Sequence, residues 1–218
     1  KYWPNPASLC KELLDMGIQP VVSVWPTVNS KSENFQYMSD KNYLVRTETG
    51  LFNTFDFCGN NTFMDATNPD AAKFVWSKIK KNYVDLGFKN FWLDEAEPET
   101  HPQTYSNFKF YVGNGAQTAM LYPYYYSKMF YEGLKEAGEE DIILLTRAGY
   151  PGSQKFGALL WSGDIESTFE NLTASVKTGL SMSMSGIPWW NSDIGGFFGG
   201  DIESDYFKEL IVRWMQFG

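Results

Sequence analysis

The stretch NPDAAKFVWSKIKKNYVDLGFKNFWLDEAEPET, residues 68–100, contains one complete helix-to-strand unit. The Asn-Pro pair at its start is typical of a helix cap and first turn, and Gly87 is the matching stop signal. The following FKNFWLD, residues 88–94, reads as a short buried strand built around the apolar run 91–93. The stretch therefore predicts a helix, then a strand, with four acids directly behind the apolar run of that strand.

The same step recurs on both sides of this stretch. Upstream, PASLCKELLDMG predicts a helix over 6–17 and IQPVVSVWP a strand over 18–26. Short, almost entirely apolar strands that alternate with helices indicate βα units around a parallel sheet whose strands are covered on both faces. Downstream, the same signals predict helices over 122–138, 168–180 and 202–218, and strands over 141–149, 157–164 and 181–193.

The residues at the strand ends favour a barrel over a doubly wound sheet. Each predicted strand ends in polar or aromatic side chains, and a (β/α)8 TIM barrel places its active site at those ends. Five strands cannot close a barrel of eight. The sequence therefore predicts residues 1–218 as a fragment of a catalytic (β/α)8 barrel that lacks the first and last βα units. Two long excursions, at about 27–68 and 100–123, interrupt it.

Composition excludes several classes of function. With 43% hydrophobic residues the chain can bury a sizeable core, and its net charge of -8 has the wrong sign for nucleic acid or an anionic membrane. No run reaches the length of a membrane span, and the first residues do not resemble a signal peptide. We expect a soluble chain, and a bacterial cytoplasmic, periplasmic or secreted location stays open.

Few side chains other than carboxylates are available for catalysis. Cys10 and Cys58 lack the spacing of a metal or disulfide motif, and we expect both to be reduced. His101 is the only histidine and lies beside a proline in a polar loop, where a surface role is the simpler interpretation. Bond breaking is therefore assigned to acids.

Two acids lie at the ends of predicted strands. Asp94 directly follows the apolar run 91–93, and Asp164 is the last residue of LLWSGD. A pair of carboxylates that face one pocket is the minimum apparatus for glycoside hydrolysis, and the abundant Trp and Tyr suit stacking on sugar rings. The alternative is that both acids cap helices, as loop-edge aspartates often do.

Several blocks then resemble one family. FWLDEAEPE, RAGYPGSQKFGALLWSGDIEST and GLSMSMSGIPWWNSDIGGFFGG are similar, in this order, to the central blocks of glycoside hydrolase family 31. PASLCKELLDMGIQPVVSVWPTV and FMDATNPDAAKFVW match its earlier blocks, so the resemblance covers nearly the whole chain. It implies a retaining α-glycosidase on a (β/α)8 barrel, with no metal and no organic cofactor.

The resemblance also implies roles for single residues. The nucleophile matches Asp94 and the general acid/base matches Asp164, while Arg147 matches an arginine that binds sugar hydroxyls. Further substrate-binding positions match Trp161, Asp193, Phe197, Trp25 and Trp92. The plainer alternative is that the tryptophans are core residues and that Asp193 caps a turn.

The other acids behind the strand receive lesser roles. We expect Glu97 to support the site through hydrogen bonds without reacting. Glu95 and Glu99 are expected to be solvated, so replacing Glu95 by Gln should leave turnover largely intact.

The motifs look most like the α-xylosidase branch, which predicts release of α-linked xylose or glucose from an oligosaccharide. α-Galactosidase and α-N-acetylgalactosaminidase activities stay open, as does a non-catalytic carbohydrate-binding relative. The resemblance further implies that the rest of a parent polypeptide supplies the missing barrel strands and flanking β-sandwich domains.

Overall fold

A parallel sheet with helices on one face organises the larger of two compact units, Lys1–Gly157 and Ala158–Gly218. The computed structural model describes residues 3–48, 55–56, 59–98 and 105–218, and each unit is described by itself. Glu99 and His101, as well as Cys58, lie outside the described residues, whereas Cys10 is buried with a free thiol, as predicted.

Three parallel strands form the sheet of the larger unit. They are β1 (Val21–Val24), β6 (Asn90–Leu93) and β9 (Leu144–Thr146), with β6 in the middle. Each falls inside a strand predicted from the sequence. Their last residues are in register, because Val24 pairs with Leu93 and Leu93 with Thr146.

Two helices of this unit begin at asparagine caps, and the cap at Asn68 is the one predicted from the sequence. The Asn5 side chain accepts from the Ser8 amide at the start of α1 (Pro6–Asp15), and Asn68 accepts from two amides at the start of α3 (Pro69–Asn82). The third long helix is α5 (Tyr122–Glu136). Short 3-10 turns follow α3 at η1 (Val84–Leu86) and precede the second unit at η4 (Ser153–Phe156).

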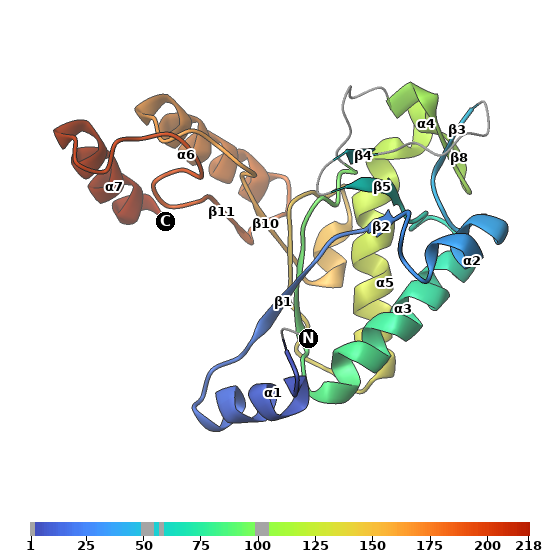
Figure 1. Cartoon of the computed structure of the whole chain (residues 1–218). Coiled ribbons are helices and arrows are strands. Elements are labelled where there is room, and N and C mark those ends of the chain that lie inside the picture. The colour runs from blue at the N-terminus through green and yellow to red at the C-terminus, as the bar shows by residue number, and fades with distance from the viewer. Residues whose placement is uncertain (1–2, 49–54, 57–58, 99–104) are drawn as a thin grey trace. The chain divides into compact units, whose positions relative to one another are not determined.

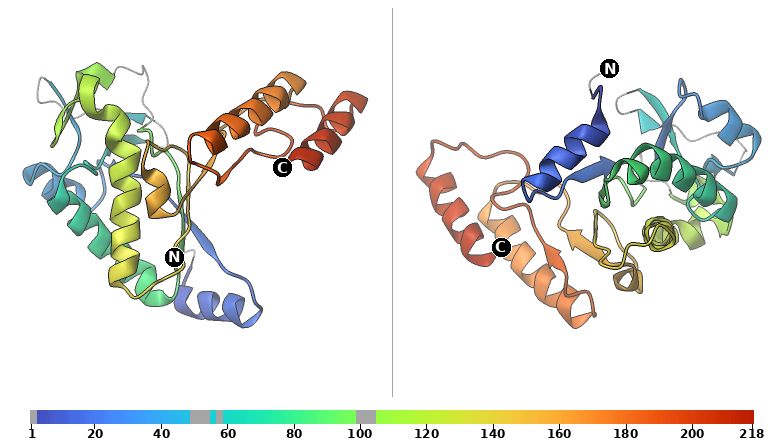
Figure 2. Two further views of the ribbon diagram at one scale, coloured as in Figure 1. Left: turned by 180° about the vertical axis from the view of Figure 1, so that it is seen from behind. Right: turned by 90° about the horizontal axis from the view of Figure 1, so that it is seen from below.

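Helices α3 and α5 lie side by side against the sheet (Figures 1 and 2). A Cβ atom at Gly133 of α5 would lie 2.1 Å from the Trp76 ring of α3, so glycine is needed for this close approach. Phe91 and Leu93 of β6 are buried in the same core. The helix layer therefore fixes the orientation of β6.

The opposite face of the sheet is more exposed than the sequence predicts. Val21 is exposed and Trp92 is 37% exposed, although both belong to apolar strands expected to be covered on both faces. In the described residues of this unit the helices cover one face only. The uncovered face is the one that a closed barrel turns toward its interior.

Both excursions contain secondary structure of their own. The first holds β2 (Thr27–Asn29), α2 (Phe35–Asp40), β3 (Arg46–Thr47), β4 (Phe55–Asp56) and β5 (Asn60–Phe63), and its antiparallel sheet has the order β2-β5-β4. The second holds η2 (Tyr105–Asn107), β7 (Phe108–Phe110), β8 (Gly113–Asn114), α4 (Gly115–Thr118) and η3 (Ala119–Leu121).

The two excursions are joined to each other. Strand β3 of the first pairs with β7 of the second, with Arg46 opposite Lys109. The buried Asp65 of the first accepts a hydrogen bond of 2.6 Å from the Tyr111 amide of the second. Burial raises the pKa of Asp65, and the hydrogen bonds from Thr67 and the Tyr111 amide counter that rise.

The smaller unit contains two strands and two helices, β10 (Ala158–Trp161), α6 (Phe169–Met184), β11 (Trp190–Asn191) and α7 (Asp205–Phe217). The strands are parallel, with Leu160 opposite Trp190. Helices α6 and α7 lie side by side (Figures 1 and 2). Helix α7 buries Leu210 and Trp214, and the Trp214 indole N–H donates to Ser192 Oγ at 2.8 Å.

One predicted boundary in this unit is wrong. Residues 181–184, assigned to a strand from the sequence, continue helix α6. The hydroxyls of Ser181 and Ser185 donate to the carbonyls of Lys177 and Ser181 one turn earlier, so these serines fit in a helix. The chain leaves the helix at Gly186, whose φ is 79°.

No helix among the described residues is both long enough and apolar enough to cross a membrane.

Candidate active site

Three predicted site residues stand in one row at the carboxyl edge of the larger sheet. Trp25, Asp94 and Arg147 are each the first residue after β1, β6 and β9, whose last residues are in register. Backbone hydrogen bonds extend the ladder to this row, from the Asp94 amide to Val24 and from the Arg147 amide to Leu93. Strand pairing therefore sets the spacing of the three side chains.

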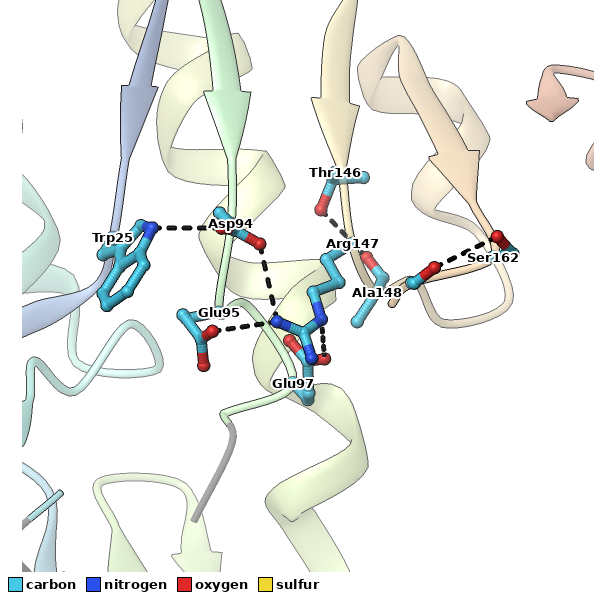
Figure 3. A network of polar contacts seen from close by, with 9 residues as sticks. Trp25, Asp94, Glu95, Glu97, Thr146, Arg147, Ala148 and Ser162 are labelled. Carbon is cyan, nitrogen blue, oxygen red and sulfur yellow. Dashed lines mark hydrogen bonds and ion pairs between the residues drawn. The ribbon is translucent and has the colours of Figure 1, made fainter. Parts of the chain in front are cut away.

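Asp94 is held from both sides (Figure 3). The Trp25 indole N–H donates to its Oδ2 at 3.1 Å, and Arg147 Nη1 lies 3.7 Å from its Oδ1. The second distance is too long for a hydrogen bond, so the arginine acts on Asp94 through its charge. The Asp94 side chain is 15% exposed, which leaves it partly accessible at the edge of the sheet.

Arg147 makes its short contacts with two other carboxylates. Its Nη1 donates to Glu95 Oε1 at 2.8 Å, and its Nε lies 2.9 Å from Glu97 Oε1 (Figure 3). Three carboxylates thus surround one guanidinium that is itself largely buried. Its rigid fork of donors fixes the spacing of these acids.

The expectation that Glu95 is solvated is wrong. Its residue is only 6% exposed, and its carboxylate is hydrogen-bonded to Arg147. Its backbone has a φ of 55°, in the left-handed region that residues with side chains seldom adopt. The sequence contains one signal for this burial. Glu95 lies two and four residues after Leu93 and Phe91, whose side chains point to the buried face of β6.

Glu97 makes the supporting contact that the sequence predicts. Its bond to Arg147 Nε is an ion pair, and its side chain is 24% exposed. That it does not react stays a prediction.

Two aromatic residues complete this region. Tyr126 of α5 is fully buried; burial raises its pKa and the negative charge of Asp94 raises it further, so it stays a neutral phenol. Trp92 projects from the exposed face of β6, opposite to the face of Phe91 and Leu93.

The smaller unit carries the remaining predicted residues. Trp161 is the last residue of β10 and is half-buried, while Asp164 lies three residues further on and is exposed. Between them Gly163 has a φ of 72°, which turns the chain at the strand end. Burial raises the pKa of Asp193 and the charge of Asp164 raises it further, so these two carboxylates interact.

Phe197 is placed by backbone pairing beside the Asp164 segment. Its amide donates to Ile165 at 2.8 Å, and the Ser167 amide donates to Phe198 at 2.9 Å. The Phe197 side chain itself is 62% exposed. The structure thus brings Trp25, Asp94 and Arg147 together in one unit, and brings the segment of Asp164 beside Asp193 and Phe197 in the other.

Comparison with known proteins gives a consistent result. The family model of the glycosyl hydrolases family 31 TIM-barrel domain matches residues 1–218 and confirms the predicted (β/α)8 fold class. The chain is 46% identical to an uncharacterized family 31 glucosidase of Pseudescherichia vulneris over 98% of its length, and 33% identical to α-xylosidase A of Aspergillus niger over 99%.

Solved structures agree with this family. The crystal structure of a family 31 α-xylosidase from a soil metagenome, complexed with xylose, matches 98% of the chain with a TM-score of 0.94 and 50% identity. The chain covers 40% of the Pseudescherichia protein, 33% of the Aspergillus protein and 32% of the metagenomic enzyme.

Proposed function

Since the chain belongs to glycosyl hydrolase family 31, we propose that the protein containing it hydrolyses α-glycosidic bonds with retention of configuration. The observation that carries this proposal is the strand-end Asp94, held by the Trp25 indole and faced by the Arg147 guanidinium. A carboxylate that attacks carbon has to be oriented and partly accessible, and this arrangement meets both needs.

In the proposed reaction Asp94 attacks the anomeric carbon while Asp164 gives a proton to the leaving oxygen. The bond between the anomeric carbon and that oxygen breaks, and a glycosyl-enzyme ester forms on Asp94. Water then attacks the same carbon as Asp164 takes its proton, which releases the sugar and restores both acids. Two inversions at one carbon give net retention.

Surrounding side chains supply binding and orientation. Arg147 is assigned to hydrogen bonding with a sugar hydroxyl, and the aromatic surface for the C–H face of the sugar is assigned to Trp25, Trp92, Trp161 and Phe197. Asp193, which interacts with Asp164, is assigned to the wall of the same sugar pocket. Neither step calls for a metal or an organic cofactor.

The preferred substrate class is the α-xylosides of oligosaccharides. The support is the 50% identity to the metagenomic α-xylosidase that was crystallised with xylose. α-Glucosides are the second candidate, because the Pseudescherichia relative is named a family 31 glucosidase. The polypeptide beyond these 218 residues, including the other barrel strands, is proposed as the partner that completes the site.

A panel of p-nitrophenyl α-glycosides tests the proposal on the full polypeptide that contains this chain. We expect the highest kcat/KM on the α-xyloside, a lower value on the α-glucoside, and an α-configured first product by NMR. If the α-galactoside or the N-acetyl-α-galactosaminide is turned over fastest, the substrate class is that glycoside and the α-xyloside assignment is wrong. Binding of xylose without hydrolysis of any substrate would show a non-catalytic carbohydrate-binding protein.

A further inference from the structure

Glu95 occupies a position that neither its charge nor its backbone favours. Its carboxylate is buried, where an ionised acid is costly unless it is paired, and its backbone has a φ of 55°. The neighbouring acid Asp94 already ends the strand and carries the chemistry in the proposed function. A second buried acid directly behind it therefore calls for a reason of its own.

The contacts of Arg147 provide that reason. Nη1 is the guanidinium nitrogen that both acids share: it lies 2.8 Å from Glu95 Oε1 and 3.7 Å from Asp94 Oδ1. The hydrogen bond goes to Glu95, and Asp94 is left with the charge alone. Glu97 takes the Nε side of the same group at 2.9 Å.

This division matters for reactivity. A guanidinium bound directly to the attacking carboxylate would stabilise its charge and make it a poorer nucleophile, whereas a guanidinium held at 3.7 Å attracts the carboxylate without a hydrogen bond to it. The negative charges of Glu95 and Glu97 also offset the positive charge of Arg147.

We propose that Glu95 is a positioning residue, whose buried carboxylate holds the Arg147 guanidinium just short of a direct hydrogen bond with Asp94. The inference rests on the proposed function, since it describes how the nucleophile of that reaction stays reactive. Replacing Glu95 by Gln keeps the shape but removes the charge, so Arg147 is expected to move toward Asp94 and slow its attack.

A mechanism-based label separates this role from a structural one. A 5-fluoro-α-xylosyl fluoride loses fluoride as Asp94 forms the ester, and fluoride needs little help from a general acid. Intact-protein mass spectrometry of the full polypeptide then gives two quantities. The final labelled fraction counts correctly folded sites, and the labelling rate measures the reactivity of the Asp94 carboxylate.

For Glu95→Gln we expect the labelling rate to fall by about tenfold or more, the scale of a hydrogen bond between charged groups, with the labelled fraction unchanged. An unchanged rate, or a lower labelled fraction at the wild-type rate, would overturn the proposal. If that variant is not recovered folded, Glu95→Asp carries the same test, because its shorter side chain lengthens the bond to Nη1.

Two further variants test whether the effect of Glu95→Gln acts through Arg147. In an Arg147→Met background, adding Glu95→Gln is expected to cause no further loss, and a fully additive loss would contradict action through the arginine. Glu132→Gln removes an exposed acid that pairs with Lys128 at 3.5 Å on α5, and should leave the rate unchanged. A wild-type polypeptide that neither labels nor hydrolyses any α-glycoside would instead refute the proposed function itself.

Discussion

The two candidate catalytic aspartates have different surroundings. Asp94 directly follows β6, has its amide in the strand ladder, and has its carboxylate between an indole and a guanidinium. Asp164 lies on an exposed turn three residues after β10, behind a glycine with a φ of 72°. One acid is held by three strands, whereas the other is held by the local turn.

This difference fits the two proposed roles. A nucleophile has to meet one carbon from one direction, so it gains from fixed neighbours that hold its orientation. A general acid/base has to exchange its proton with water during each turnover, so it gains from access to solvent. The contrast suggests that changes around Asp94 act on reactivity, and changes around Asp164 on proton transfer.

The largest effect is expected from removing the carboxylate of Asp94. Asp94→Gly should lower kcat by about 10⁴-fold or more on the preferred p-nitrophenyl α-glycoside, because no covalent intermediate forms. Added azide should restore turnover and give a β-glycosyl azide by a single inversion. An α-glycosyl azide from this variant would exchange the two assigned roles.

Asp164→Gly should follow, with a dependence on the leaving group. We expect a loss of about 10²- to 10⁴-fold on substrates with a poor leaving group, the range of general acid catalysis, and a much smaller loss in the first step on a glycosyl fluoride. Azide should here give the α product by two inversions. A loss that is equal for all leaving groups would remove Asp164 from the acid role.

Trp25→Phe tests the indole contact with Asp94. The N–H to carboxylate bond of 3.1 Å disappears while a smaller aromatic ring stays in place, so kcat/KM should fall by about tenfold, as expected for a hydrogen bond to a charged group. Trp3→Phe serves as the control, since Trp3 is largely exposed. Equal kinetics in both variants would leave Trp25 as a packing residue.

The smallest effect concerns stability and pH at Asp193. Burial and the charge of Asp164 raise the pKa of Asp193 in the folded protein above its ordinary value of 3.8. The stability that Asp193 contributes is therefore fully present below pH 3.8 and is lost as the pH rises through the folded-state pKa. The melting temperature of Asp193→Asn, relative to wild type, should therefore increase from pH 4 to pH 7. Glu140→Gln, at an exposed position, is the control, and a pH-independent difference for Asp193→Asn would contradict the interaction.

Much of the fold could be predicted because its signals are local. The Asn68 cap, the glycine stops and the apolar runs each act within a few residues, and the observed strands lie inside the predicted ones. Helix α6 was misjudged because serine is neutral in helices, and its bonds to earlier carbonyls leave no mark in the sequence.

The site was predictable only in part. The row of Trp25, Asp94 and Arg147 follows from strand ends, which sequence patterns locate well. The partner of Glu95 lies 52 residues away, and its left-handed backbone is set by tertiary contacts. Four acids in six positions look equivalent in the sequence, and the distance to one guanidinium distinguishes three of them.

The pairing of β3 with β7 has a consequence for engineering. Because each excursion contributes a strand to the same small sheet, exchanging only one of them with a relative would leave the other strand with an unsatisfied edge. The Asp65 bond to Tyr111 would be lost in the same exchange. Chimeras that aim to alter specificity should therefore transplant both loops as one cassette, and natural variation in the two should be inherited together.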